Sequence, residues 1–220
     1  MRTAIFDLDG TLADTSADLI AAANACFEGR GQGSPLDPVA DALTAFRGGR
    51  AMLRLGVERL GLSDVIIDEE YQTLLDHYAA HIDVHTVLYP GVEAALDRLA
   101  AEGWVLGVCT NKPEGLAETL LTRLGIRDRF AAMLGADTLP VRKPDPEHFF
   151  ETVRRGGGDA ARSALVGDTV TDRDTARNAG IPSVLVGFGP MGEGIASLDP
   201  DAILDHYDDL PALLDRLIPH

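Results

Sequence analysis

Short apolar runs alternate with amphipathic segments over most of the chain. The runs at residues 3–7, 104–109, 131–134, 164–166 and 183–186 have the length and composition of buried strands. Helical periodicity occupies residues 91–101, 113–124, 146–155 and 172–179 between them. Because strands that alternate with helices of this size form right-handed βαβ units, the pattern predicts an α/β fold with a doubly wound parallel sheet, Rossmann-like in its connections.

One long stretch does not follow this alternation. From about residue 15 to residue 85 the pattern is helical only, in four segments that are interrupted at 29–38, 48–49 and 61–63. A loop of that length without its own secondary structure is uncommon in a compact domain. We therefore predict a small helical cap domain, residues 15–85, inserted into an α/β core made of residues 1–14 and 86–220.

Composition narrows the classes of partner. The chain has 220 residues, of which 45% are hydrophobic and 25% charged, as is typical of a compact globular protein. Its 19 basic and 35 acidic residues give a net charge of −16. Such a surface offers no basic stripe for a nucleic-acid backbone and repels anionic lipid, so we expect neither a nucleic acid nor a membrane as partner.

The two cysteines, Cys26 and Cys109, are far apart and have no metal-binding spacing, which fits a reducing compartment. The N-terminus shows no basic and apolar signal-peptide pattern, and no apolar run reaches the ~20 residues of a membrane span. The expected location is cytoplasmic, with the chain a monomer or a homodimer.

Lysine is rare in this sequence. Only Lys112 and Lys143 accompany 17 arginines, and each is followed by proline. A coding bias toward arginine would explain the ratio and make the two lysines incidental. Alternatively, both positions require a compact ammonium group.

Polar residues gather in four segments near the predicted strand ends: DLDGT at 7–11, TNKP at 110–113, KPDP at 143–146 and GDTVTD at 167–172. The carboxyl ends of parallel strands meet at one edge of a sheet, where ligands bind. Asp7 and Asp168 both follow apolar strands and together suit Mg²⁺, which prefers oxygen ligands. Lys143 and Thr110 would add contacts to a phosphate.

Several of these positions have a structural interpretation as well. Asp168 could cap the helix that follows it, and Asp172 could stabilise the first turn of that helix. Lys112 is either a second cation at the mouth of the site or a solvated surface residue. Asp9 lies two residues beyond Asp7, so an extended chain returns its carboxylate to the same side, where it can serve as an acid or base.

In this order, the four segments resemble the motifs of the haloacid dehalogenase superfamily, in its capped, Mg²⁺-dependent phosphatase branch. FDLDGTLADTS at 6–16 and TNKP at 110–113 are most similar to the phosphoglycolate phosphatase group. The resemblance implies that Asp7 is a nucleophile that forms an aspartyl-phosphate. It implies that Asp9 protonates the leaving group and then activates water.

The same resemblance implies the ligands. Mg²⁺ would be held by the carboxylates of Asp7 and Asp168 and by the backbone carbonyl of Asp9. The substrate phosphate would be bound by Thr110, by the backbone at Asn111 and by Lys143, with Asp172 orienting Lys143 or a water on the metal. In the cap, we expect Arg50, and less directly Arg47, to recognise the part of the substrate remote from the phosphate, such as a carboxylate. The simpler interpretation of these arginines is a solvated stripe in which Arg54 pairs with Glu58, four residues further along the helix.

These expectations converge on a Mg²⁺-dependent phosphatase that hydrolyses a small phosphorylated metabolite, with 2-phosphoglycolate as the best candidate. Two alternatives remain open from the sequence. A related enzyme could transfer the phosphoryl group within a sugar phosphate, as a mutase does. A non-enzymatic chain could instead accept a phosphoryl group on Asp7 and act as a switch or binding module.

Overall fold

The computed structural model describes residues 1–219, apart from the side chain of Glu193. The chain forms two compact units. One combines Met1–Ala13 with Leu88–His220, and the other is Asp14–Val87.

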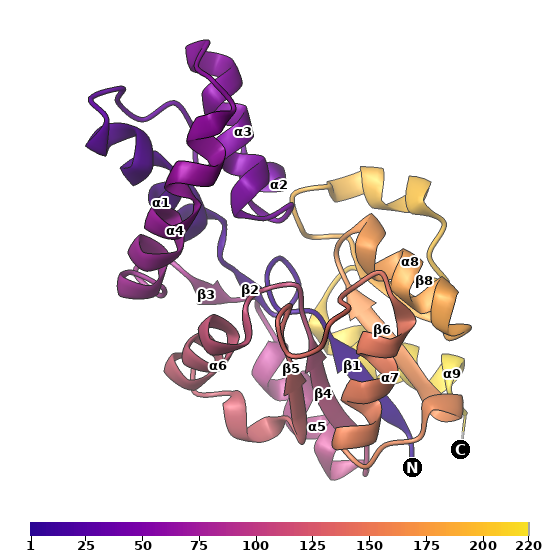
Figure 1. Ribbon diagram of the computed structural model, residues 1–220. Coiled ribbons are helices and arrows are strands. Elements are labelled where there is room, and N and C mark those ends of the chain that lie inside the picture. The colour runs from indigo at the N-terminus through magenta and orange to yellow at the C-terminus, as the bar shows by residue number, and fades with distance from the viewer. Residues whose placement is uncertain (220) are drawn as a thin grey trace. The chain divides into compact units, whose positions relative to one another are not determined.

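The larger unit is built on a six-stranded parallel sheet (Figure 1). Its strands are β1 (Thr3–Phe6), β4 (Val105–Cys109), β5 (Ala132–Leu134), β6 (Ser163–Gly167), β7 (Ser183–Val186) and β8 (Ala202–Leu204). Their spatial order is β5-β4-β1-β6-β7-β8. The chain therefore steps outward from β1 on one side and then returns to step outward on the other, which confirms the predicted doubly wound sheet.

Helices cover this sheet. On one face, α7 (Pro146–Arg155) and α8 (Val170–Ala179) pack against each other and against the central strands. The other helices are α5 (Val92–Ala101), which packs with α9 (Leu210–Leu217), and α6 (Glu114–Arg123), which packs beside β5. Short 3₁₀ turns lie at Arg127–Arg129, Ala160–Arg162, Gly192–Leu198 and Tyr207–Asp209.

Side chains from alternate strand positions form the core under α7 and α8. Ile5, Cys109 and Leu165 point to that face and pack with Phe149 of α7 and Ala176 of α8, all nearly inaccessible to solvent. Burial raises the pKa of the Cys109 thiol to about 12, so this cysteine acts as a small apolar core residue. The apolar runs in the sequence correspond to these central strands.

The smaller unit is helical, as its periodicity predicts. It contains α1 (Ser16–Gly29), α2 (Ala42–Ala45), α3 (Gly49–Leu60) and α4 (Val65–Ala80), with α1, α3 and α4 packed on one another. Gly56 allows α3 to approach α1 closely, because a Cβ atom there would lie 2.4 Å from the ring of Phe27. Helix α3 starts just after Gly48, whose φ of 93° suits glycine.

Two short strands, β2 (Ala13–Asp14) and β3 (Val87–Leu88), pair where the chain passes between the units. Within the smaller unit, the buried carboxylate of Asp18 accepts hydrogen bonds from the backbone N–H groups of His85 and Thr86 and from the Thr86 hydroxyl. The start of α1 is thus tied to the end of the helical segment.

Among the described residues, none of the helices is both long enough and apolar enough to cross a membrane.

Candidate active site

Sheet register brings the predicted motifs to one edge. Phe6 at the end of β1 lies beside Val108 of β4 and Val166 of β6. The backbone N–H of Asp7 continues the ladder by donating to the Val166 carbonyl at 2.9 Å. The residues that follow these three strands therefore emerge side by side, at the point where the direction of winding reverses.

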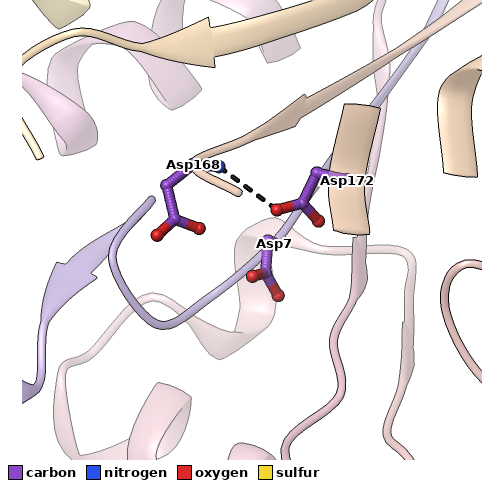
Figure 2. Close-up of side chains that lie close together, drawn as sticks. All are labelled: Asp7, Asp168 and Asp172. Atoms are coloured by element: carbon purple, nitrogen blue, oxygen red, sulfur yellow. Dashed lines mark hydrogen bonds between the residues drawn. The ribbon is translucent and has the colours of Figure 1, made fainter. Parts of the chain in front are cut away.

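Three carboxylates meet at this edge. Oxygen atoms of Asp7, Asp168 and Asp172 lie within 4.8 Å of one another, and Figure 2 shows the three side chains gathered between the strand ends and the start of α8. Burial raises the pKa of Asp7 to about 6, against the opposing effect of Lys143. Burial, together with the neighbouring carboxylates of Asp172 and Asp7, also raises the pKa of Asp168. Negative charge at this position is costly unless a cation shares the site.

Lys143 bridges two of these carboxylates. Its Nζ atom lies 2.9 Å from Asp7 Oδ1 and 2.6 Å from Asp172 Oδ1, and the residue is only 3% exposed. Although burial alone would lower it, the carboxylates of Asp172 and Asp7 hold the pKa of Lys143 above its ordinary value. A fixed positive charge therefore stands directly beside Asp7.

Asp172 is held on both of its oxygens. Its Oδ1 atom accepts a hydrogen bond from the Lys143 ammonium. Its Oδ2 atom accepts hydrogen bonds from the backbone N–H groups of Asp168 and Thr169 and from the Thr169 hydroxyl. Thr169 is the N-cap of α8 and forms a capping box with Asp172. The interpretation of Asp168 as the helix cap is therefore wrong. Asp172 closes the capping box of α8 and also contacts Lys143.

Glycine at 167 is required by this packing, since a Cβ atom there would overlap the Asp172 side chain at 2.3 Å.

The donor set fits a magnesium ion. It consists of oxygen atoms only, from the buried carboxylates of Asp7 and Asp168, with both oxygens of Asp172 already engaged. Asp7 Oδ1 is buried and accepts no hydrogen bond of regular geometry, although Lys143 pairs with it electrostatically. A hard divalent cation between Asp7 and Asp168 would offset their repulsion.

Asp9 lies in a tight turn just beyond Asp7. Gly10 adopts a φ of 78°, and the N–H groups of Leu12 and Ala13 both donate to the Leu8 carbonyl. The turn leaves Asp9 partly exposed, and its carboxylate accepts two contacts from Lys112 Nζ, at 2.8 and 3.2 Å. Lys112 is only 6% exposed, so it is not a solvated surface lysine.

The motif that follows β4 is fixed by its own hydrogen bonds. The Thr110 hydroxyl oxygen accepts from the backbone N–H of Lys112 at 3.2 Å, and Thr110 is 1% exposed. The Asn111 side chain donates to the carbonyl of Lys143 at 3.0 Å. The TNKP and KPDP motifs are therefore connected directly.

Comparison with known proteins identifies the family of the chain. Residues 4–186 match the sequence profile of the family described as haloacid dehalogenase-like hydrolase. The chain belongs to this family of hydrolases.

Relatives of the hydrolase extend over nearly its full length. A protein of Agrobacterium fabrum named phosphoglycolate phosphatase is 41% identical over 98% of this chain and 93% of its own. One of the same name from Mesorhizobium japonicum is 40% identical over 97% and 95%. A solved structure of a predicted phosphoglycolate phosphatase from Haemophilus somnus superposes with a TM-score of 0.86, at 27% identity over 97% of each chain.

Two residues that support the hydrolase site, Tyr207 and Asn178, have no signal in the sequence, and Thr11 stands in the DLDGT motif but was given no role there. The Thr11 hydroxyl donates to Asp168 Oδ1 at 3.2 Å, and the hydroxyl of the buried Tyr207 donates to the Thr11 carbonyl at 2.7 Å. The Asn178 side chain donates to the carbonyl of Pro144 at 3.0 Å. These contacts join positions 34 to 196 residues apart, so only the fold can reveal them.

Arg50 belongs to the smaller unit. It lies in the first turn of α3, pairs with Asp68 at 2.5 Å and stands 4.5 Å from the ring centre of Tyr71. Its side chain is 55% exposed. A role for Arg50 in substrate recognition stays a prediction.

Proposed function

We propose that this hydrolase is a phosphatase that uses Mg²⁺ to hydrolyse a small phosphate monoester, with 2-phosphoglycolate as its substrate, through an aspartyl-phosphate. The observation that carries the proposal is the pairing of a buried carboxylate, Asp7, with a buried ammonium, Lys143, that Asp172 holds in place. The names of the relatives from Agrobacterium fabrum and Mesorhizobium japonicum support the choice of substrate.

The first step forms a bond between a carboxylate oxygen of Asp7 and phosphorus and breaks the bond to the leaving oxygen. Lys143 stabilises the negative charge of the phosphoryl oxygens while it keeps Asp7 oriented. The Thr110 hydroxyl, which already accepts from the backbone of Lys112, can donate its own proton to a phosphoryl oxygen.

Asp9 supplies the proton that the leaving alkoxide needs. In the second step it takes a proton from the water that attacks the same phosphorus, so phosphate leaves and Asp7 returns to a free carboxylate. Asp7 and Asp9 thus have separate roles. Their environments also differ, because Asp7 is buried among carboxylates and Asp9 lies in a turn that leaves it partly exposed.

Asp7, Asp168 and the Asp9 carbonyl would hold the Mg²⁺ ion. The ion supplies Lewis-acid stabilisation of the phosphoryl oxygens and offsets the charge of the two carboxylates. Thr11 contributes by fixing Asp168 through its hydroxyl group.

The direct test is release of inorganic phosphate from 2-phosphoglycolate, with and without Mg²⁺, beside a panel of sugar phosphates, nucleotides and pyrophosphate. We expect 2-phosphoglycolate to have the highest kcat/KM and EDTA to abolish turnover. Asp7→Asn should lower kcat by at least about 1000-fold, because it removes the nucleophile.

The product separates the proposal from the alternatives. A sugar phosphate that isomerises without release of phosphate would indicate a mutase, and a stable phospho-Asp7 protein without turnover would indicate a switch. Full activity of Asp7→Asn would refute the covalent mechanism.

A further inference from the structure

Both lysines of the chain lie at the proposed active site. The sequence contains 17 arginines and two lysines, and Lys143 and Lys112 are 3% and 6% exposed. The mechanism above uses Lys143. It gives no task to Lys112, whose ammonium contacts both oxygens of Asp9.

Stability alone is a weak reason to bury this second lysine. Removing an ammonium and a carboxylate from water costs about as much as their attraction returns, and apolar residues of similar volume often replace a buried ion pair without loss. The chain uses arginine almost everywhere else. A buried lysine in a chain that otherwise uses arginine indicates that the ammonium of Lys112 binds an anionic ligand.

The backbone of Lys112 is rigidly placed. Its N–H donates to the Thr110 hydroxyl at 3.2 Å, and its carbonyl accepts from the N–H of Ala136 at 2.9 Å. Gly135 comes so close that a Cβ atom there would lie 2.8 Å from the Lys112 carbonyl oxygen. The side chain is buried and its ammonium contacts both oxygens of Asp9, so the charge is preorganised, which lowers the cost of binding an anion there.

The position of the Lys112 ammonium indicates which end of the substrate it would contact. Lys143 pairs with the nucleophile, Asp7, on the side of the transferred phosphoryl group. Asp9 contacts the leaving oxygen in the proposed mechanism, so a cation 2.8 Å from Asp9 lies beside the leaving group. In 2-phosphoglycolate a carboxylate follows the ester oxygen after a single carbon, which places it within reach of the same ammonium.

We propose that Lys112 is a specificity-determining residue that binds an anionic group, a carboxylate on the α-carbon, of the leaving alcohol. The inference rests on the proposed phosphatase function and deepens it. Without Lys112 such a carboxylate would lie beside Asp9 with no cation to offset its charge. With it, short phosphate esters of hydroxy acids are favoured over esters of neutral alcohols.

A matched pair of substrates isolates this contact. 2-Phosphoglycolate and 2-phosphoglycolamide have the same ester bond and nearly the same size, and differ in the charge of the remote group. We expect wild type to prefer the acid and Lys112→Met to reduce the ratio of the two kcat/KM values at least tenfold. Lys112→Arg, which keeps the charge, should retain most of the ratio.

A purely positioning role of Lys112 gives another result. If Lys112 acted only through Asp9 or on the phosphate, Lys112→Met would slow both substrates equally and leave the ratio unchanged, which overturns the inference. The inference is also overturned if Arg50→Gln removes the preference for 2-phosphoglycolate over the amide while Lys112→Met keeps it. Recognition of the carboxylate would then belong to the helical unit.

Binding measurements keep this test independent of turnover. The Kd values of both compounds, measured by calorimetry with Mg²⁺ on Asp7→Asn and on Asp7→Asn with Lys112→Met, give the ratio without catalysis. Loss of the preference in the double variant supports the inference, and an unchanged preference refutes it. If wild type released no phosphate from either of the two esters or from any compound of the panel above, the proposed phosphatase function itself would be refuted.

Discussion

Of the two carboxylates that contact Lys143, Asp172 is the one that also belongs to a helix start. Asp172 binds Lys143 at 2.6 Å while its other oxygen closes the capping box of α8, so the helix start and Lys143 share one carboxylate. A side chain that orients another is expected to affect rate more than substrate binding.

Asp172→Asn should therefore lower kcat by about 10- to 100-fold, because the amide keeps the shape but loses the charge that fixes Lys143. KM for 2-phosphoglycolate should change far less. Steady-state kinetics at saturating Mg²⁺ provide the measurement, with Asp174→Asn as control on the same helix. Equal loss in the control variant would show that α8, rather than the ion pair, is responsible.

His148 is a buried base outside the site. It is 0% exposed, and its Nε2 atom lies 3.0 Å from the Gly135 carbonyl, to which the neutral ring donates. Burial, with the nearby charge of Lys143, lowers the pKa of His148 to about 4. The folded state thus favours the neutral ring, and an unfolded chain takes up a proton at higher pH than the folded one.

This difference predicts a pH dependence of stability. The contribution of His148 is complete above pH ~6.5, the unfolded value, and is lost as the pH falls from there to about 4 at no more than about 1.4 kcal/mol per unit. In His148→Gln, which keeps a donor, the free energy of unfolding should decline less over this interval. Urea denaturation of both proteins at pH 7.5, 6.0 and 5.0 measures it, and parallel declines would exclude His148 as the cause.

At the level of elements, the loop after β5 and the start of α6 are in direct contact. A Cβ atom at Gly135 would lie 2.4 Å from the backbone of Glu114, whereas one at Gly115, the next residue of α6, would meet nothing within 4 Å. The two glycines are therefore a matched pair with opposite expectations.

Gly135→Ala should reduce the free energy of unfolding by about 1–3 kcal/mol, because backbone must move to make room. It should also slow catalysis, since the same loop holds Lys112. Gly115→Ala lies within α6 and should raise stability by up to about 1 kcal/mol through helix propensity. Thermal and urea unfolding of the two variants test the contrast, and similar stabilities would mean that the loop yields without cost.

The sequence predicted the central elements well because each carries a local signal. The run at 183–186 is β7 and the helical pattern at 146–155 is α7, with identical bounds. Strand β8 escaped prediction because it has three residues, of which Ala202 and Ile203 are not fully buried, so its apolar pattern is weak. Helix α9 was not anticipated either.

The site residues also fall into two groups, those that the sequence could predict and those that it could not. Asp7, Asp168 and Lys143 follow strands or stand in motifs, so their convergence could be predicted from the parallel sheet. The contacts of Lys112 with Asp9 and of Tyr207 with Thr11 span 103 and 196 residues. Such pairs depend on the exact path of loops, which periodicity does not encode.

At the scale of the whole molecule, charge opposes the proposed substrate. A net charge of −16 repels an anion that carries about three negative charges. The two lysines proposed to bind this anion, Lys112 and Lys143, are buried. Salt screens exposed charges over a Debye length of ~30 Å at 0.01 M and ~8 Å at 0.15 M, but screens buried pairs much less. Repulsion during approach should therefore weaken with salt while the contacts in the site persist.

We accordingly expect kcat/KM for 2-phosphoglycolate to rise roughly two- to fivefold between 10 and 150 mM KCl at constant free Mg²⁺. The amide analogue, with one negative charge fewer, should respond less, and kcat should stay nearly constant because the long-range term acts before binding. A fall in kcat/KM with salt would mean that positive potential from the site already reaches beyond the acidic surface and steers the substrate inward.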